Sequence, residues 1–190
     1  MRSFIALNLP DAERYELHEA ARPIREAVGA AAWVTPGNLH LTLKFLGDVD
    51  ETRRVLLGER LRVLGAAHRP LALDVGGGGV FPNFRAPRIV WVGVAPDARL
   101  ELLHHDVERA CEGLGFPVDG RAFRPHITLG RLRAQPDVSG RRTLRHAVRS
   151  CAFDRRIAVS TVDLMERRPG PGGSAYTVGL AAPLGDGEER

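Results

Sequence analysis

The sequence lacks the long apolar runs and the paired cysteines that mark membrane and secreted proteins. The apolar stretch Phe4–Leu9 is short and Pro10 interrupts it, so it does not form the core of a signal peptide, and no later run approaches membrane-spanning length. Only two cysteines occur, Cys111 and Cys151, and neither lies in a motif. We expect both to be reduced core residues. The sequence therefore predicts a cytoplasmic protein without a membrane partner.

Lysine is almost absent. Lys44 is the only lysine among 27 lysines and arginines, and the formal net charge is +4. Arginine suits phosphate because its planar guanidinium makes bidentate hydrogen bonds. Genome composition can also enrich a protein in arginine, alanine and glycine, and we take it to be the larger cause of the arginine excess. The charge thus permits a nucleic-acid partner without requiring one.

Two other patterns are incomplete. Four glycines, Gly76–Gly79, follow the apolar run Leu71–Val75, but the Lys-Ser or Lys-Thr of a phosphate loop is missing and no helical pattern follows directly. We interpret these glycines as a turn or bulge that ends a strand. No His-x-His or His-x-x-x-His pair occurs near His40 or His126, so the sequence predicts neither a metal site nor another cofactor.

The length of 190 residues suffices for one core or for two closely joined lobes. Apolar periodicity predicts four helices, the first kinked or divided at Pro23, at 11–28, 50–67, 96–114 and 141–149. It predicts strands at 1–9, 32–35, 39–46, 71–75, 89–94, 125–132, 152–159, 161–167 and 176–181. The turn Pro36-Gly37 is expected to join the second and third strands as a hairpin, and residues 185–190 to form a flexible tail.

One short phrase occurs twice. The first copy, Asn-Leu-His-Leu-Thr-Leu, contains His40 and Thr42, and the second, Arg-Pro-His-Ile-Thr-Leu, contains His126 and Thr128. Chance predicts about a quarter of one His-x-Thr in a chain of this composition. Because side chains alternate along a strand, His and Thr of each copy share one face while the apolar residues point into a core. The alternative is two half-buried strands whose polar positions happen to be His and Thr.

The two copies have comparable settings and lie about half the chain apart. A helix and a short extended segment precede each predicted motif strand. We therefore expect an α+β fold of two similar lobes related by a pseudo-two-fold axis. Each lobe would be a mostly antiparallel sheet with helices on its outer face, presenting one His-x-Thr to a central cleft. Residues 1–190 would form this single two-lobed domain.

Two such motifs point to acid–base chemistry on an anion. Imidazoles titrate near neutrality and can serve as one acid and one base, and two threonine hydroxyls can hold the oxygens of an anion. Arg131, on the second motif strand or at its end, is a candidate for a further phosphate contact. Other candidate substrate contacts are the aromatic residues Phe45, Phe81, Phe84 and Tyr176, although packing is favoured for Phe81 and more strongly for Trp91.

With these motifs the sequence resembles a known family, the bacterial and archaeal RNA 2′,3′-cyclic phosphodiesterases. These proteins have long been called 2′-5′ RNA ligases and belong to the two-histidine phosphoesterase superfamily. The resemblance rests on the phrases 40–47 (His-Leu-Thr-Leu-Lys-Phe-Leu-Gly) and 126–131 (His-Ile-Thr-Leu-Gly-Arg). It extends to Phe81-Pro82, Pro87-Arg88, Trp91-Val92-Gly93 and the opening Arg2-Ser3-Phe4-Ile5-Ala6. It covers almost the whole chain.

The resemblance implies metal-independent hydrolysis of a 2′,3′-cyclic phosphate at an RNA end, tRNA fragments among the candidates, to leave a 2′-phosphate. It implies that His40 is the proton donor and His126 the proton acceptor; spacing alone does not assign these roles. Reversible 2′-5′ ligation at the same site stays open, and a monomer is expected. Two alternatives remain: a phosphodiesterase acting on small cyclic nucleotides or an ADP-ribose cyclic phosphate, and a non-catalytic RNA-binding module.

Overall fold

The computed structural model describes residues 2–170 and 173–185. Its helices are α1 (Asp11–Ala20), α2 (Arg22–Ala27), the short 3-10 helix η1 (Pro36–Asn38), α3 (Glu51–Ala67), α4 (Ala98–Glu112) and α5 (Val138–Arg149). Its strands are β1 (Arg2–Asn8), β2 (Ala31–Trp33), β3 (His40–Asp48), β4 (Leu71–Phe81), β5 (Ile89–Val94), β6 (His126–Leu132), β7 (Asp154–Val159), β8 (Thr161–Gly170) and β9 (Gly173–Pro183). Most of the tail predicted for 185–190 lies outside the described residues.

The strands form one antiparallel sheet made of two four-stranded halves. Its order is β7-β4-β5-β6-β3-β1-β8-β9, and β2 adds to β6 beside this path. The halves meet where β6 pairs with β3, through the single pair Leu41 and Ile127. The expected α+β fold of two similar lobes is confirmed, and the two motif strands lie at its centre.

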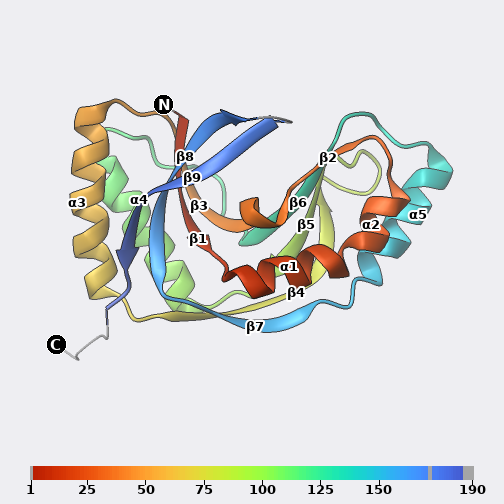
Figure 1. The fold of residues 1–190 in the computed structure, drawn as a ribbon, viewed down its shortest axis with the longest axis horizontal. Helices are drawn as coiled ribbons and strands as arrows, with labels where there is room; N and C mark the ends of the chain where they lie inside the picture. Colours follow the sequence, from red (N-terminus) through yellow and green to blue (C-terminus); the bar gives the residue numbers. More distant parts are fainter. Residues whose placement is uncertain (1, 171–172, 186–190) are drawn as a thin grey trace.

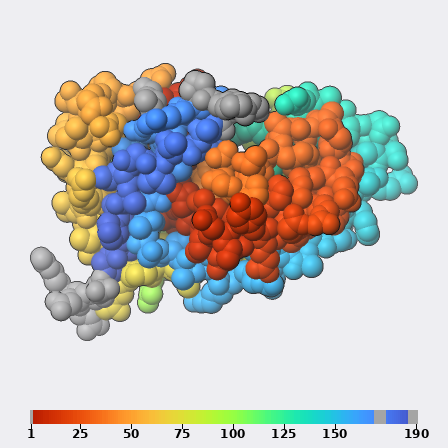
Figure 2. Space-filling view, viewed as in Figure 1, coloured from red at the N-terminus to blue at the C-terminus, as the bar shows by residue number. Residues whose placement is uncertain are grey.

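Helices cover each half of the sheet separately. Helices α3 and α4 pack against β3, β8 and β9, whereas α5 packs against β4 and α2, so the two groups lie at opposite ends of the molecule (Figure 1). The last strands complete the lobe that the first strand begins, and the N-terminal residues, red to orange, lie beside the blue C-terminal strands in the space-filling view (Figure 2). In the described residues, no helix combines the length and apolar character needed to cross a bilayer.

The predicted hairpin between 32–35 and 39–46 is wrong. Strand β2 pairs with β6, with Trp33 opposite Gly130, rather than with β3. The residues after β2 form η1, which is longer than a two-residue hairpin turn and redirects the chain. The partner of β2 is therefore a strand about a hundred residues away in sequence.

The predicted end of a strand at Gly76 is also wrong, because β4 continues through all four glycines to Phe81. The interpretation of a bulge is confirmed: the register with β5 shifts between Gly76 and Gly78, and Gly77 has φ of +66°. Gly79 is needed for space, since a Cβ there would lie 2.2 Å from the Trp91 ring. The glycines thus serve packing in a sheet.

The predicted helices agree with the structure better than the predicted strands do. The first predicted helix is divided as expected, with α1 ending at Ala20 and Pro23 in the first turn of α2. Asp50 caps α3 by accepting a hydrogen bond from the Arg53 N–H. Helix α5 begins at Val138, three residues earlier than predicted, because Asp137 caps it by accepting from the Gly140 N–H at 2.7 Å.

Candidate active site

The pairing of β3 with β6 brings the two motifs together. Leu41 lies opposite Ile127, and both side chains are fully buried on the helix-covered face. One step along the antiparallel register places Thr42 across from His126, and His40 across from Thr128. All four polar side chains are half-buried and share the other face, here called the site face. The arrangement predicted from the repeat is therefore present as two neighbouring pairs.

Both imidazoles are held in the same way. His40 Nδ1 lies 2.7 Å from the Asn38 carbonyl oxygen, and His126 Nδ1 lies 2.7 Å from the Arg124 carbonyl oxygen. A carbonyl oxygen only accepts hydrogen bonds, so each Nδ1 must carry the hydrogen. This contact to the residue two positions earlier fixes both tautomers and leaves each Nε2 to take or give a proton. Sequence reasoning missed these two carbonyl groups.

Aromatic rings surround His40. Phe4 of β1 stacks on the imidazole with ring centroids 4.8 Å apart, and Tyr176 of β9 meets it edge-on at 5.6 Å. Burial lowers the pKa of His40 to about 4; the Asn38 carbonyl opposes this shift, and the charges of Arg14 and His126 add to it. His40 is therefore neutral at pH 7 before substrate binds.

A second aromatic pair lies against His126. Phe81 meets this imidazole edge-on with centroids 4.9 Å apart, and Trp91 lies at 6.3 Å. Burial also lowers the pKa of His126, opposed by the Arg124 carbonyl and assisted by the Arg131 charge. The sequence favoured packing roles for Phe81 and Trp91; the structure places both rings beside the second histidine. The sequence analysis did not predict Phe4 as a site residue, although side-chain alternation along its strand could have placed it on the site face.

Matching β-bulges place Phe45 and Arg131 on the site face. In β3 the register against β1 gains an extra residue at Leu43, and in β6 the register against β5 gains one at Leu129. Each extra residue reverses the alternation, so the side chain five positions after each histidine returns to the histidine's face. Phe45 is 68% exposed, and the Arg131 guanidinium is near enough to act on His126. The two lobes thus present an aromatic ring and a cation at equivalent positions.

The two remaining predicted residues have different surroundings. Tyr176 lies beside both Phe4 and His40, and its backbone N–H donates to Asn38 Oδ1 at 3.4 Å. Phe84 packs against the apolar core, with the Arg145 guanidinium 5.1 Å from its ring centre. The structure therefore brings Tyr176 into the site and favours packing for Phe84.

The low pKa of His40 predicts a pH-dependent stability. Below pH 6.5 an imidazole in the unfolded chain takes up a proton, whereas His40 stays neutral in the fold until about pH 4. The unfolded state then binds more protons, so the free energy of unfolding falls as the pH drops through this range. Between pH 7 and pH 5 we expect His40→Gln to lose about 1–2 kcal/mol less than the wild type. Urea unfolding at the two pH values measures this difference.

The exposed His105 provides the control for that experiment. His105→Gln should follow the wild type at both pH values, because this side chain is exposed on α4 and lies outside the site. The same pH dependence in His40→Gln and in the wild type would contradict the burial of a neutral imidazole at position 40.

The fold and site together define a two-lobed protein with one anchored imidazole on each of its two central strands. Comparison with known proteins is consistent with this class: the chain belongs to the 2′-5′ RNA ligase superfamily, whose family model matches residues 10–171. The resemblance drawn from the two motifs is confirmed.

Two curated relatives bear the name RNA 2′,3′-cyclic phosphodiesterase. The protein from Archaeoglobus fulgidus is 36% identical over 140 residues, which make up 73% of this chain and 77% of that relative. The protein from Geobacillus stearothermophilus is 37% identical over 128 residues, 67% of this chain but 41% of the relative. This chain thus spans less than half of the second relative's length.

Solved structures show the same fold over the whole chain. The protein TT0787 of Thermus thermophilus superposes with a TM-score of 0.82 and 28% identity, covering 100% of both chains. E. coli LigT complexed with 3′-AMP has a TM-score of 0.74 and 26% identity, covering 96% of this chain and 97% of that one. The two-lobed architecture is therefore shared with proteins of known structure.

Proposed function

We propose that this protein hydrolyses 2′,3′-cyclic phosphate ends of RNA, without a metal ion, to 2′-phosphate ends. The observation that carries the proposal is the pair of imidazoles on adjacent strands, each with Nδ1 held by a carbonyl and Nε2 available for proton transfer. The names of the relatives, RNA 2′,3′-cyclic phosphodiesterase, support this substrate class.

The reaction needs an acid and a base on opposite sides of phosphorus. His126 Nε2 would take a proton from water as the water oxygen bonds to phosphorus, and His40 Nε2 would give a proton to O3′ as the P–O3′ bond breaks. The product keeps its phosphate on O2′. Strain in the five-membered ring already favours opening. Proton transfer by two protein groups is therefore sufficient for the reaction.

The division of roles requires His40 to gain a proton when the substrate binds. Both histidines are neutral near pH 7 in the free protein, since burial lowers the pKa of each. A bound phosphodiester anion would stabilise an imidazolium and so supply the acid with its proton.

The other residues of the site face would bind the substrate. Thr42 and Thr128 would donate hydrogen bonds to the non-bridging oxygens, where charge grows in the transition state. Arg131 would contact a phosphate, and Phe45 and Tyr176 would contact the terminal nucleoside. The position of Phe84 gives it a packing role in this proposal.

An oligoribonucleotide ending in a 2′,3′-cyclic phosphate tests the proposal. We expect the purified protein to convert the end to a 2′-monoester with chelator present, and ³¹P NMR distinguishes the cyclic diester from the 2′- and 3′-monoesters. In ¹⁸O-labelled water one label should enter the phosphate. Binding without ring opening would instead favour the RNA-binding module.

A small cyclic nucleotide or an ADP-ribose cyclic phosphate is the alternative substrate. Comparing kcat/KM for a mononucleotide and an oligomer separates these classes, because only the oligomer offers phosphates beyond the ring.

We propose in addition that the protein acts as a cytoplasmic monomer; sedimentation measures the oligomeric state. Incubating the product with an RNA that has a free 5′-hydroxyl tests for reverse ligation.

Phe45 offers a test of substrate contact that leaves the core intact. We expect Phe45→Ala to raise KM for an oligomer by a factor corresponding to about 1–3 kcal/mol, the usual contribution of one base stacked on an aromatic ring, with little change in thermal stability. Val63→Ala is the control, since Val63 is 74% exposed on α3. An unchanged KM in Phe45→Ala would remove this ring from the proposed nucleoside contact.

A further inference from the structure

The two histidines occupy equivalent positions, but their cross-strand neighbours differ in chemistry. Strand β1 places Asn8 opposite His40, whereas β5 places Gly93 opposite His126. Gly93 has no side chain, and a Cβ there would lie 3.0 Å from the Gly76 carbonyl oxygen. Asn8 therefore places a polar side chain beside His40, whereas the equivalent position beside His126 has no side chain.

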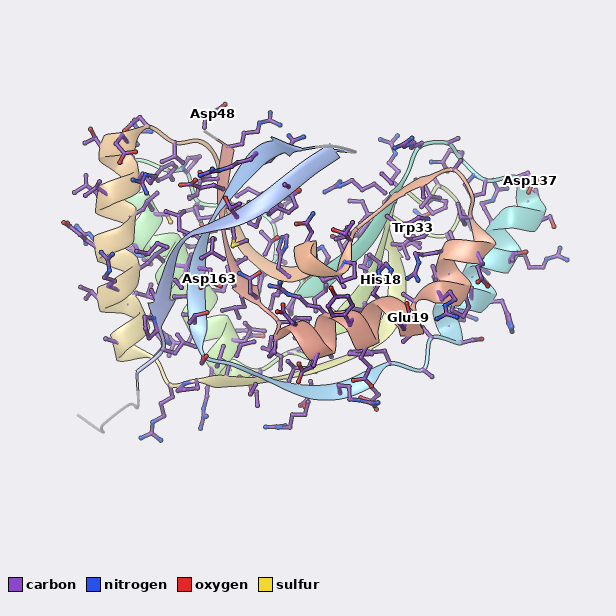
Figure 3. The ribbon with its side chains drawn as sticks, in the orientation of Figure 1. His18, Glu19, Trp33, Asp48, Asp137 and Asp163 are labelled. Atoms are coloured by element: carbon purple, nitrogen blue, oxygen red, sulfur yellow. The ribbon has the colours of Figure 1, made fainter. Side chains whose placement is uncertain are left out.

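Asn8 links a cation to a buried carboxylate. Its Nδ2 donates to Asp163 Oδ2 at 2.6 Å, and its Oδ1 accepts from an Arg14 guanidinium nitrogen at 2.7 Å. Asp163, labelled on β8 in Figure 3, is 3% exposed. Its Oδ1 has no hydrogen-bond partner within the described part of the chain. A buried carboxylate oxygen without a donor is costly, so the contact with the Asn8 amide is important for holding Asp163 in this position.

The same guanidinium holds the backbone that orients His40. A second Arg14 nitrogen donates to the Gly37 carbonyl oxygen at 3.1 Å. Gly37 belongs to η1, and the next residue, Asn38, supplies the carbonyl that holds His40 Nδ1. Arg14 thus connects the first turn of α1, the end of β1 and the turn before β3. The neighbouring pair, Asn8 and Asp163, in turn fixes Arg14.

We propose that Arg14, Asn8 and Asp163 form a positioning network that orients His40 and makes its environment different from that of His126. This inference rests on the proposed function. The network acts through orientation and through charge, because the Arg14 guanidinium disfavours a second positive charge on the imidazole. The other titratable groups that face His40 are His126 from β6 and Tyr176 from β9.

Arg14→Met removes the charge and the donors while keeping an unbranched side chain. Long-range ¹H–¹⁵N NMR reports the titration and the tautomer of each histidine without any need for turnover. We expect the titration midpoint of His40 to rise and that of His126 to stay, and kcat on the cyclic-phosphate oligomer to fall about 10- to 100-fold through misplacement of the acid. Arg156→Met is the control: Arg156 pairs with Asp74 on an exposed surface of β7 and β4.

Two further variants separate charge from geometry. Arg14→Lys keeps the positive charge but loses the planar fork that reaches both oxygens, so we expect a lower kcat with a His40 midpoint close to that of the wild type. Asp163→Asn keeps the shape but removes the counter-charge, so the His40 midpoint should fall further. If Arg14→Met does not fold, these two variants decide the question.

Equal shifts of both histidine midpoints in the variants that fold would overturn the proposal, as would a kcat within about twofold of the wild type in all of them. Failure of the proposed function has a different signature, namely a wild-type protein that opens no cyclic phosphate while its histidines still titrate differently.

Discussion

His40→Ala and His126→Ala are each expected to lower kcat by about 10²- to 10⁴-fold, the usual contribution of one positioned proton transfer, while the protein still folds. The reason lies in the site geometry. Each imidazole offers its Nε2 from its own strand and has its tautomer fixed by its own carbonyl. Neither can move to replace the other. Turnover of an oligoribonucleotide with a cyclic-phosphate end, together with thermal unfolding, measures both quantities.

The double variant and an exposed histidine provide the controls. If the two groups act in one concerted step, the double variant should be little slower than the worse single variant, because residues that act as a unit are not additive. His105→Ala should keep wild-type kcat, since this residue lies exposed on α4. A kcat above about one tenth of the wild type in either single variant would contradict the mechanism.

The largest expected effect on stability comes from Lys44, which the second motif copy replaces with Gly130. Its Nζ donates to Glu108 Oε2 at 2.6 Å and to the Pro117 carbonyl oxygen at 2.8 Å, and both ionic side chains are buried. Lys44→Met leaves the Glu108 carboxylate without its counter-ion. We expect this to lower the free energy of unfolding by about 3–5 kcal/mol, measured by urea unfolding at pH 7.

Replacing both partners should recover most of the loss. Lys44→Met with Glu108→Leu removes both charges, and apolar replacements of buried pairs are often neutral or stabilising. Arg109→Met, which breaks an exposed pair with Glu112 on α4, should change the free energy of unfolding by less than about 1 kcal/mol. A double variant that is less stable than Lys44→Met would show that the pair contributes more than mutual neutralisation.

Alternation along a single strand made the site face of each motif predictable. The pattern of His40 and Thr42 between buried leucines fixes their face without knowledge of any partner strand. The bulges at Leu43 and Leu129 could not be foreseen, because an extra residue is defined only against the neighbouring strand. The sequence therefore named Phe45, as an aromatic residue, and Arg131, by its position after His126, without showing that they return to the site face.

The pairing of β2 with β6 could not be predicted from the sequence for a related reason. Local turn residues suggested a hairpin, but the apolar surface of Trp33 is satisfied by a distant strand, where its ring lies across Gly130. The rings of Phe4 and Trp91 reach the histidines in the same way, from neighbouring strands of the sheet whose pairing is not local in the sequence. Contacts across the sheet depend on register, and register is set by the whole fold.

The single Leu41–Ile127 pair between the two halves of the sheet has a mechanical consequence. Every other junction along the path has at least four paired positions, so this seam is the least reinforced line across the sheet. One imidazole stands on each side of it. The separation of the two Nε2 atoms therefore depends on how the two halves of the sheet are aligned at this one junction.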